Sequence, residues 1–279
     1  MRPSPSALFV VGAIALATGV GFAARSASGS ETTRDDGIPA DAARLGFVPS
    51  LRLPAAANVS GVTLLDATQP FRIELSHGAV SGSPPAPERL LRAQVIVSRE
   101  LARYPRTFLH AIRMRGIVFA DDLMEGETSI PSLPNVGGLL LLDVNGTDAD
   151  LTRGLHHEVY HFADLADDGT VSPDPAFDAL NTKGFAYGAG GRSLRSSWAA
   201  LRPEGIDGFV SAYAMSGVEE DKAETFAFAM ARPAQTREQA EREPVLAAKL
   251  EEIARRLGRL DPEAPRLLAS VGQKPAPLR

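Results

Sequence analysis

Two histidines four residues apart constrain the fold of this chain more than any other feature. His157 and His161 lie in the apolar segment LHHEVYHFAD, residues 155–164, with Glu158 between them. Residues i and i+4 share one face of an α-helix, so both imidazoles can point toward one metal ion. The spacing therefore predicts a helix through this segment with a metal on one side of it.

The same segment contains the groups needed for metal-dependent hydrolysis. Glu158 follows the first histidine directly, where its carboxylate could take a proton from a water molecule that the metal activates. A chance match is the alternative, although it is rare in a chain with 5 His. The chain has 0 Cys, so a metal must take His and carboxylate ligands, a set that suits Zn²⁺.

Two further polar residues of this segment have less certain roles. His156 is five residues before His161, a spacing that turns it about 140° away on a helix. We expect it not to share the metal but to lie at the helix edge or to hydrogen-bond the substrate. Asp164, three residues after His161, could orient a metal ligand or be solvated, and the sequence leaves both open.

The N-terminal segment predicts export. Arg2 precedes an apolar run over residues 7–24, which small residues follow, as in secretory signals. We expect residues 1–26 to be a signal peptide of a secreted or periplasmic protein. The alternative is an uncleaved anchor helix, which would be the only contact with a membrane. The net charge of -5 gives no reason to expect nucleic acid as a partner.

The remaining chain predicts one α+β domain over residues 47–272, after a linker at 27–46 and before a loose tail at 273–279. Thr147, Asp148 or Asp150 could cap the helix that contains the histidines. A long loop rich in Gly, Asp and Ser, from residue 167 to about 208, should shape a site. Periodicity and flanking residues also predict helices at 88–104, 210–230 and 245–257, and strands at 71–75, 112–119 and 137–144.

A second acidic group lies in the otherwise apolar segment 210–230. The run EEDK, residues 219–222, would in isolation be a solvated charge run. After the histidine motif, however, an acidic helix can supply a third metal ligand. Glu220 and Glu224 are four apart and share a face, whereas Glu219 is turned about 100° from Glu220. The spacing leaves Glu220 and Glu224 as candidates.

In these two segments the chain resembles the Glu-zincin metallopeptidases, in particular the catalytic domain of anthrax lethal factor and related bacterial zinc peptidases. The resemblance implies a zincin-like domain, with a small mixed sheet packed on the motif helix and a helical C-terminal half. It implies Glu220 as third zinc ligand, Glu224 as the group that holds a histidine ligand, and Tyr213 as a donor to the oxyanion. The matching positions are His157 to His161 with Asp164, then Tyr213, Glu220, Ala223, Glu224 and Phe226.

The expected function is therefore that of an exported zinc metallopeptidase acting on a peptide or protein. An extended substrate could pair with an exposed strand such as 139–144. One alternative is a non-catalytic, zinc-stabilised binding or sensor domain that uses the cleft to hold a partner. Another is a zinc amidase that acts on cell-wall peptides.

Overall fold

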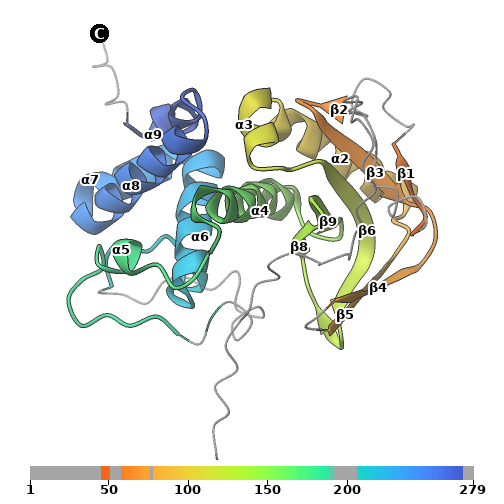
Figure 1. Ribbon diagram of the computed structural model, residues 1–279, viewed down its shortest axis with the longest axis horizontal. Helices are drawn as coiled ribbons and strands as arrows, with labels where there is room; N and C mark the ends of the chain where they lie inside the picture. Colours follow the sequence, from red (N-terminus) through yellow and green to blue (C-terminus); the bar gives the residue numbers. More distant parts are fainter. Residues whose placement is uncertain (1–44, 51–57, 76–77, 189, 191–205, 273–279) are drawn as a thin grey trace, which may run out of the picture.

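The computed structural model describes residues 45–50, 58–75, 78–188, 190 and 206–272. They form an α+β fold in which a mixed sheet and a group of helices lie on opposite sides of one central helix (Figure 1). The predicted signal peptide, nearly all of the predicted linker and the predicted tail lie outside the described residues. Within the described part of the chain, no helix is long and apolar enough to cross a membrane.

The nine-stranded sheet is built around one long strand, β6, Gly116–Glu125. The first half of β6 pairs in parallel with β3 and β9, and its second half pairs antiparallel with β5. The predicted start of this strand at residue 112 is wrong. A short helix ends at residue 111, and the chain turns at Arg113, which has a φ of 59°. The other strands are β1 Phe47–Pro49, β2 Asn58–Val59, β3 Val62–Ala67, β4 Phe71–Leu75, β5 Gly78–Ser83, β7 Thr128–Ser129, β8 Ser132–Val136 and β9 Leu139–Asp143.

Alternate residues of β6 separate two hydrophobic cores. Ile117 and Phe119 face the helices and belong to the larger core, whereas Val118 and Ala120 lie in a smaller core on the other face. This alternation is expected of a strand that is covered on both faces. The helices that cover the large-core face include α2, Pro87–Leu101, followed by α3, Arg106–Ala111.

Strand β9 is not an exposed strand, so the predicted pairing of a substrate with residues 139–144 is wrong. It lies between β6 and β8, and all five of its residues are buried. Strand β8 is the edge instead: among the described strands it pairs only with β9. The run of four leucines in β9 fits an inner strand that is buried on both faces.

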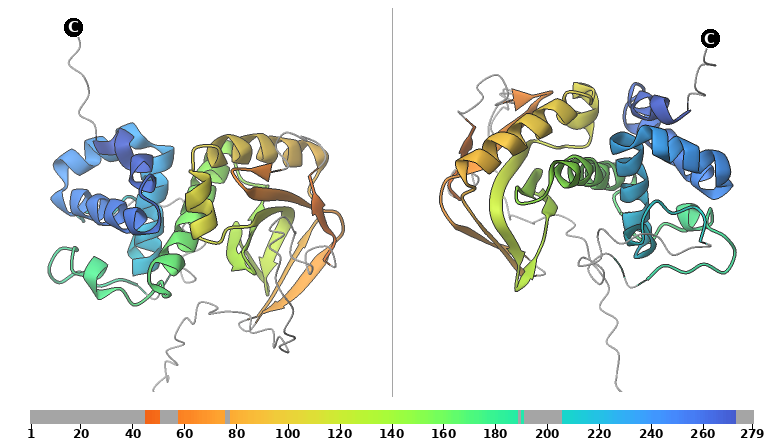
Figure 2. Two further views of the ribbon diagram at one scale, coloured as in Figure 1. Left: turned by 45° about the horizontal axis from the view of Figure 1, so that its top comes forward. Right: turned by 180° about the vertical axis from the view of Figure 1, so that it is seen from behind.

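The histidine motif lies on α4, Asp148–Asp168, between the sheet and the C-terminal helices (Figures 1 and 2). Of the three predicted caps, Thr147 is the N-cap: its side chain accepts from the Asp150 N–H, and Asp150 reaches back to the Thr147 N–H. The helix ends at Gly169, whose φ of 81° favours glycine. Every residue from Arg153 to Asp164 is buried. Helix α4 is thus a core helix, held on both sides.

The predicted helix at 210–230 is two separate elements. A short 3₁₀ helix, η3, Tyr213–Met215, comes first, and α6, Val218–Ala231, begins after Gly217. Gly217 has extended backbone geometry and caps α6, which separates Tyr213 from the helix of the glutamates. The predicted long loop contains the short helix α5, Pro175–Asp178, while residues 189 and 191–205 of that loop lie outside the described part. The C-terminal half is completed by α7 Pro233–Arg242, α8 Pro244–Leu260, η4 Ala264–Leu268 and α9 Ala269–Gly272.

Candidate metal centre

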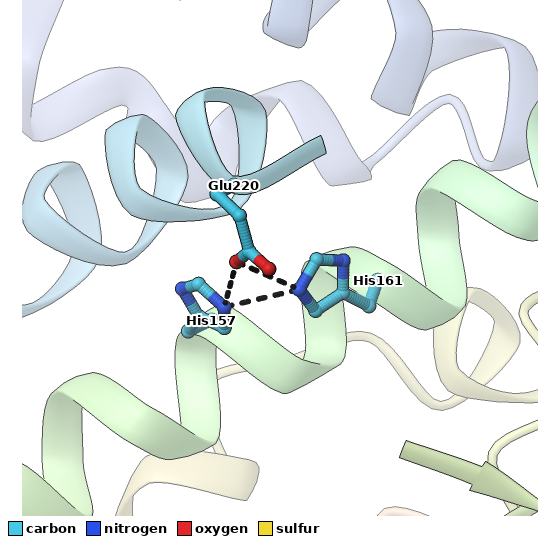
Figure 3. Close-up of side chains that lie close together, drawn as sticks. All are labelled: His157, His161 and Glu220. Atoms are coloured by element: carbon cyan, nitrogen blue, oxygen red, sulfur yellow. Dashed lines mark hydrogen bonds and ion pairs between the residues drawn. The ribbon is translucent and has the colours of Figure 1, made fainter. Parts of the chain in front are cut away.

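Three side chains from two helices converge on one point (Figure 3). The Nε2 atoms of His157 and His161 on α4 lie 3.0 Å apart. One carboxylate oxygen of Glu220 on α6 lies 3.1 Å from the first of these nitrogens and 3.5 Å from the second. All three side chains are nearly removed from solvent. Three side chains that can each offer one ligand atom therefore face one another in a buried place, and this group could hold a metal ion.

The local fold favours an ionised carboxylate at Glu220. It lies in the first turn of α6, where unpaired backbone N–H groups stabilise negative charge. Burial raises the pKa of Glu220, but the two histidines lower it more, so that this pKa lies well below its usual range. Glu220 is therefore available as an anionic ligand.

Glu224 holds His157 from the other side of the ring. Its Oε1 lies 3.0 Å from Nδ1 of His157. Its Oε2 accepts hydrogen bonds from Arg153 at 2.9 Å and from Ser211 at 2.7 Å. Burial lowers the pKa of His157, but its contacts with Glu220 and Glu224 outweigh burial and raise it to about 10. A carboxylate on the second ring nitrogen fixes the orientation of a metal-binding histidine.

Glu158 points toward the sheet. Its Oε1 accepts a hydrogen bond from the hydroxyl of Ser132 on β8. Its Oε2 is buried and has no hydrogen-bond partner among the described residues. A buried carboxylate oxygen without a partner is costly, so this oxygen is open to a donor that does not belong to the described residues.

Tyr213 lies next to His157, one of the three converging side chains. Its ring centroid is 5.9 Å from that of His157, and the residue is 4% exposed. Tyr213 belongs to the 3₁₀ helix η3 and not to α6. The segment is fastened by Ser211, two residues earlier, which donates to Glu224 and accepts from the backbone N–H of Ala214.

His156 lies away from the three converging side chains, as its spacing predicts, but the expected position at the helix edge or toward a substrate is wrong. The residue is fully buried against α2. Its Nδ1 lies 2.6 Å from the hydroxyl of Tyr104, and its Nε2 lies 3.2 Å from a carboxylate oxygen of Glu100. The ring thus ties α4 to α2 at the position next to His157.

The run EEDK is not a solvated charge run, because most of it is buried. Lys222 is fully buried and donates to Asp164 on α4 at 2.8 Å and to Asp174 before α5 at 2.9 Å. Asp221 pairs with the buried Lys249 of α8 at 2.7 Å. Asp164 is therefore not solvated: it joins the helix of the histidines to the helix of Glu220.

Three residues that contact the site, Arg153, Ser132 and Ser211, were not among those predicted from the sequence. Arg153 is four residues before His157 on the same helix face, so periodicity could have placed it near the site. Ser132 and Ser211 had no such signal. Each of these serines donates a hydrogen bond to a glutamate that is 26 or 13 residues away in the sequence. A single sequence does not distinguish such a serine from a serine in a loop.

We expect Asp164→Asn to lower the free energy of unfolding by about 2 kcal/mol, because the buried lysine loses a charged hydrogen-bond acceptor. Chemical denaturation measures this change. Glu74→Gln is the control, since Glu74 forms an ion pair with Arg72 in which both side chains are exposed, and exposed pairs contribute little. Equal loss in both variants, or no loss in the Asp164 variant, would show that the buried pair does not fasten α4 to α6.

Comparison of the chain with protein-family models, with curated proteins and with solved structures gave no match.

Proposed function

We propose that this protein is an exported zinc metallopeptidase with a zincin-like fold that hydrolyses peptide bonds. One observation carries this proposal. Two histidines and a glutamate converge within hydrogen-bonding distance of one another, and next to them Glu158 has one carboxylate oxygen without a partner among the described residues.

The distances between the three ligand atoms suit zinc. Ligand atoms about 2.0–2.1 Å from a tetrahedral zinc ion lie about 3.3 Å from one another. The three distances here are 3.0, 3.1 and 3.5 Å. Two imidazoles and one carboxylate are also a ligand set of catalytic zinc sites, which keep a fourth position open. His157, His161 and Glu220 would therefore hold the ion.

Zinc in this position would supply Lewis acidity to a water molecule and to the carbonyl of the scissile bond. Glu158 would accept the proton of the attacking water on its unpartnered oxygen and deliver it to the leaving amine as the C–N bond breaks. Tyr213, next to His157, would donate a hydrogen bond to the oxyanion. Glu224, held by Arg153 and Ser211, would keep His157 in place throughout.

The edge strand β8 is the place where we expect an extended peptide to bind. It is unpaired on one side among the described strands, and it contacts α4. Its residues after Ser132 are partly exposed. A peptide added to an edge strand gains backbone hydrogen bonds whatever its sequence, and from β8 it would pass beside Glu158.

Metal analysis and a peptide-cleavage assay test the proposed function together. The purified protein should contain about one zinc per chain, and it should cleave members of a mixed peptide library or an unfolded protein. A chelator should abolish cleavage, and added zinc should restore it. Purified protein without bound metal and without zinc-dependent cleavage would contradict the proposal.

The two alternatives predict different outcomes of the same assays. A zinc-stabilised binding or sensor domain would bind zinc but cleave no peptide. An amidase would release fragments from purified cell wall and leave unfolded protein intact. The unpartnered oxygen of Glu158 favours an enzyme, because a binding domain has no need of a poised base.

Export is also a proposal, supported by the apolar run at residues 7–24. We expect N-terminal sequencing of the exported protein to begin near residues 25–30, where small residues suit a signal peptidase. An intact Met1 in the soluble cytosol would remove this proposal. An intact Met1 in the membrane fraction would instead support an anchor.

A further inference from the structure

Ser132 on β8 donates a hydrogen bond to Glu158 on α4, and we infer that Ser132 is a positioning residue for the catalytic base. The inference depends on the proposed hydrolysis. It gives the edge strand β8 the role of holding Glu158 in place, which is separate from binding the metal.

The hydrogen bond selects which oxygen of Glu158 can act as the base. Ser132 is 6% exposed and Glu158 is 4% exposed, so water does not compete with the contact. The hydroxyl occupies Oε1, while Oε2 has no partner among the described residues. A glutamate has several side-chain torsions, and fixing one oxygen leaves the other in a defined position, as an efficient proton acceptor needs.

The position of Ser132 in the sheet also relates the base to the substrate. Its backbone is held by pairing with β9 opposite Leu142, a buried residue of the large core. The other edge of β8 is the one to which we assign the peptide. Strand β8 would thus hold the peptide backbone along its free edge and the carboxylate of Glu158 through Ser132. Because both are held by one strand, the distance between the peptide and Glu158 is set by that strand.

A second buried serine provides a matched comparison. Ser211 is 5% exposed and donates at 2.7 Å to Glu224, the residue that orients His157. Both serines are buried, and each donates to a glutamate. They differ in the role of that glutamate: Ser132 serves the base, whereas Ser211 serves the support of a metal ligand. Alanine at each position should therefore have a different consequence.

The experiment compares the full-length zinc-loaded protein with its Ser132→Ala, Ser132→Thr and Ser211→Ala variants. For Ser132→Ala we expect kcat to fall about ten- to a hundredfold, a usual cost of losing such a supporting contact, with KM and zinc affinity close to wild type. Ser132→Thr, which keeps the hydroxyl, should recover most of kcat. Ser211→Ala should weaken zinc binding, measured by competition with a chelator.

A second measurement does not depend on turnover. Acetohydroxamic acid chelates zinc and also hydrogen-bonds to a neighbouring carboxylate, so calorimetry should show weaker binding to zinc-loaded Ser132→Ala than to wild type. Wild-type kcat and hydroxamate affinity in Ser132→Ala, or a loss of zinc as large as in Ser211→Ala, would overturn the inference. If the wild type binds zinc and the hydroxamate but cleaves nothing, the proposed hydrolysis fails, while the hydroxamate comparison still decides the role of Ser132.

Discussion

Replacing Glu158 with glutamine is expected to lower the rate of peptide hydrolysis by orders of magnitude while the protein still binds zinc. Glutamine keeps the shape of the side chain but cannot accept the proton of the attacking water. General-base catalysis contributes typically 10²- to 10⁴-fold, so kcat should fall by about this factor. The proposed ligand atoms belong to His157, His161 and Glu220, none of which is changed.

Three comparisons make this result specific. His157→Ala and His161→Ala should each lose zinc, because each removes one of the three ligand atoms. Glu127→Gln, at an exposed position between β6 and β7, should keep both zinc and activity. Zinc content and initial rates are measured on the same preparations. An active Glu158→Gln protein, or zinc loss equal to that of the histidine variants, would contradict the assignment of Glu158 as the base.

The second large effect is expected along α6, where three glutamates lie within six residues of one another. Glu220→Ala should empty the site or weaken zinc binding severely, because Glu220 alone among them approaches both histidine Nε2 atoms. Glu224→Ala should weaken zinc binding about 10- to 100-fold, since it removes the support of His157 and not a ligand. Glu219→Ala should leave zinc binding nearly unchanged.

The geometry of Glu219 explains why it is the matched control. It is buried like Glu224, but its carboxylate folds back over Gly217, where an added Cβ would lie 2.5 Å from Oε1. Titration of zinc into the three chelator-stripped proteins gives the order of affinity. A Glu224 variant that binds zinc far more weakly than the Glu220 variant would exchange the two roles.

The sequence was sufficient to predict the elements whose signals are local. The histidine spacing and the possible caps predicted α4, because helix periodicity and capping depend on residues within a few positions. The strand at 71–75 is confirmed as β4, and the helices predicted at 88–104 and 245–257 correspond to α2 and α8 with small shifts at their ends. The predicted helix at 210–230 was wrong at its start, because its apolar residues continue through the break at Gly217.

The placement of charges depended on the tertiary structure. The run EEDK has the local pattern of a solvated surface, yet its lysine and its aspartate are buried against partners 58 and 28 residues away. Burying a charge is tolerable only with a partner at hydrogen-bonding distance. That partner comes from another helix, so no window of sequence around residue 222 contains it.

The division between sequence and structure is clearest at the site itself. The sequence by itself determined that His157 and His161 share a helix face and that Glu158 lies beside them, because these relations are set within about one turn of one helix. Only the tertiary structure decided that Glu220 meets both histidines, that Glu224 supports His157 from 67 residues away, and that the edge strand β8 holds Glu158 through Ser132. These contacts depend on how α4 packs against α6 and the sheet. How the helices and the sheet pack is decided by the burial of apolar side chains over the whole domain. A short motif contains too few residues to specify this packing.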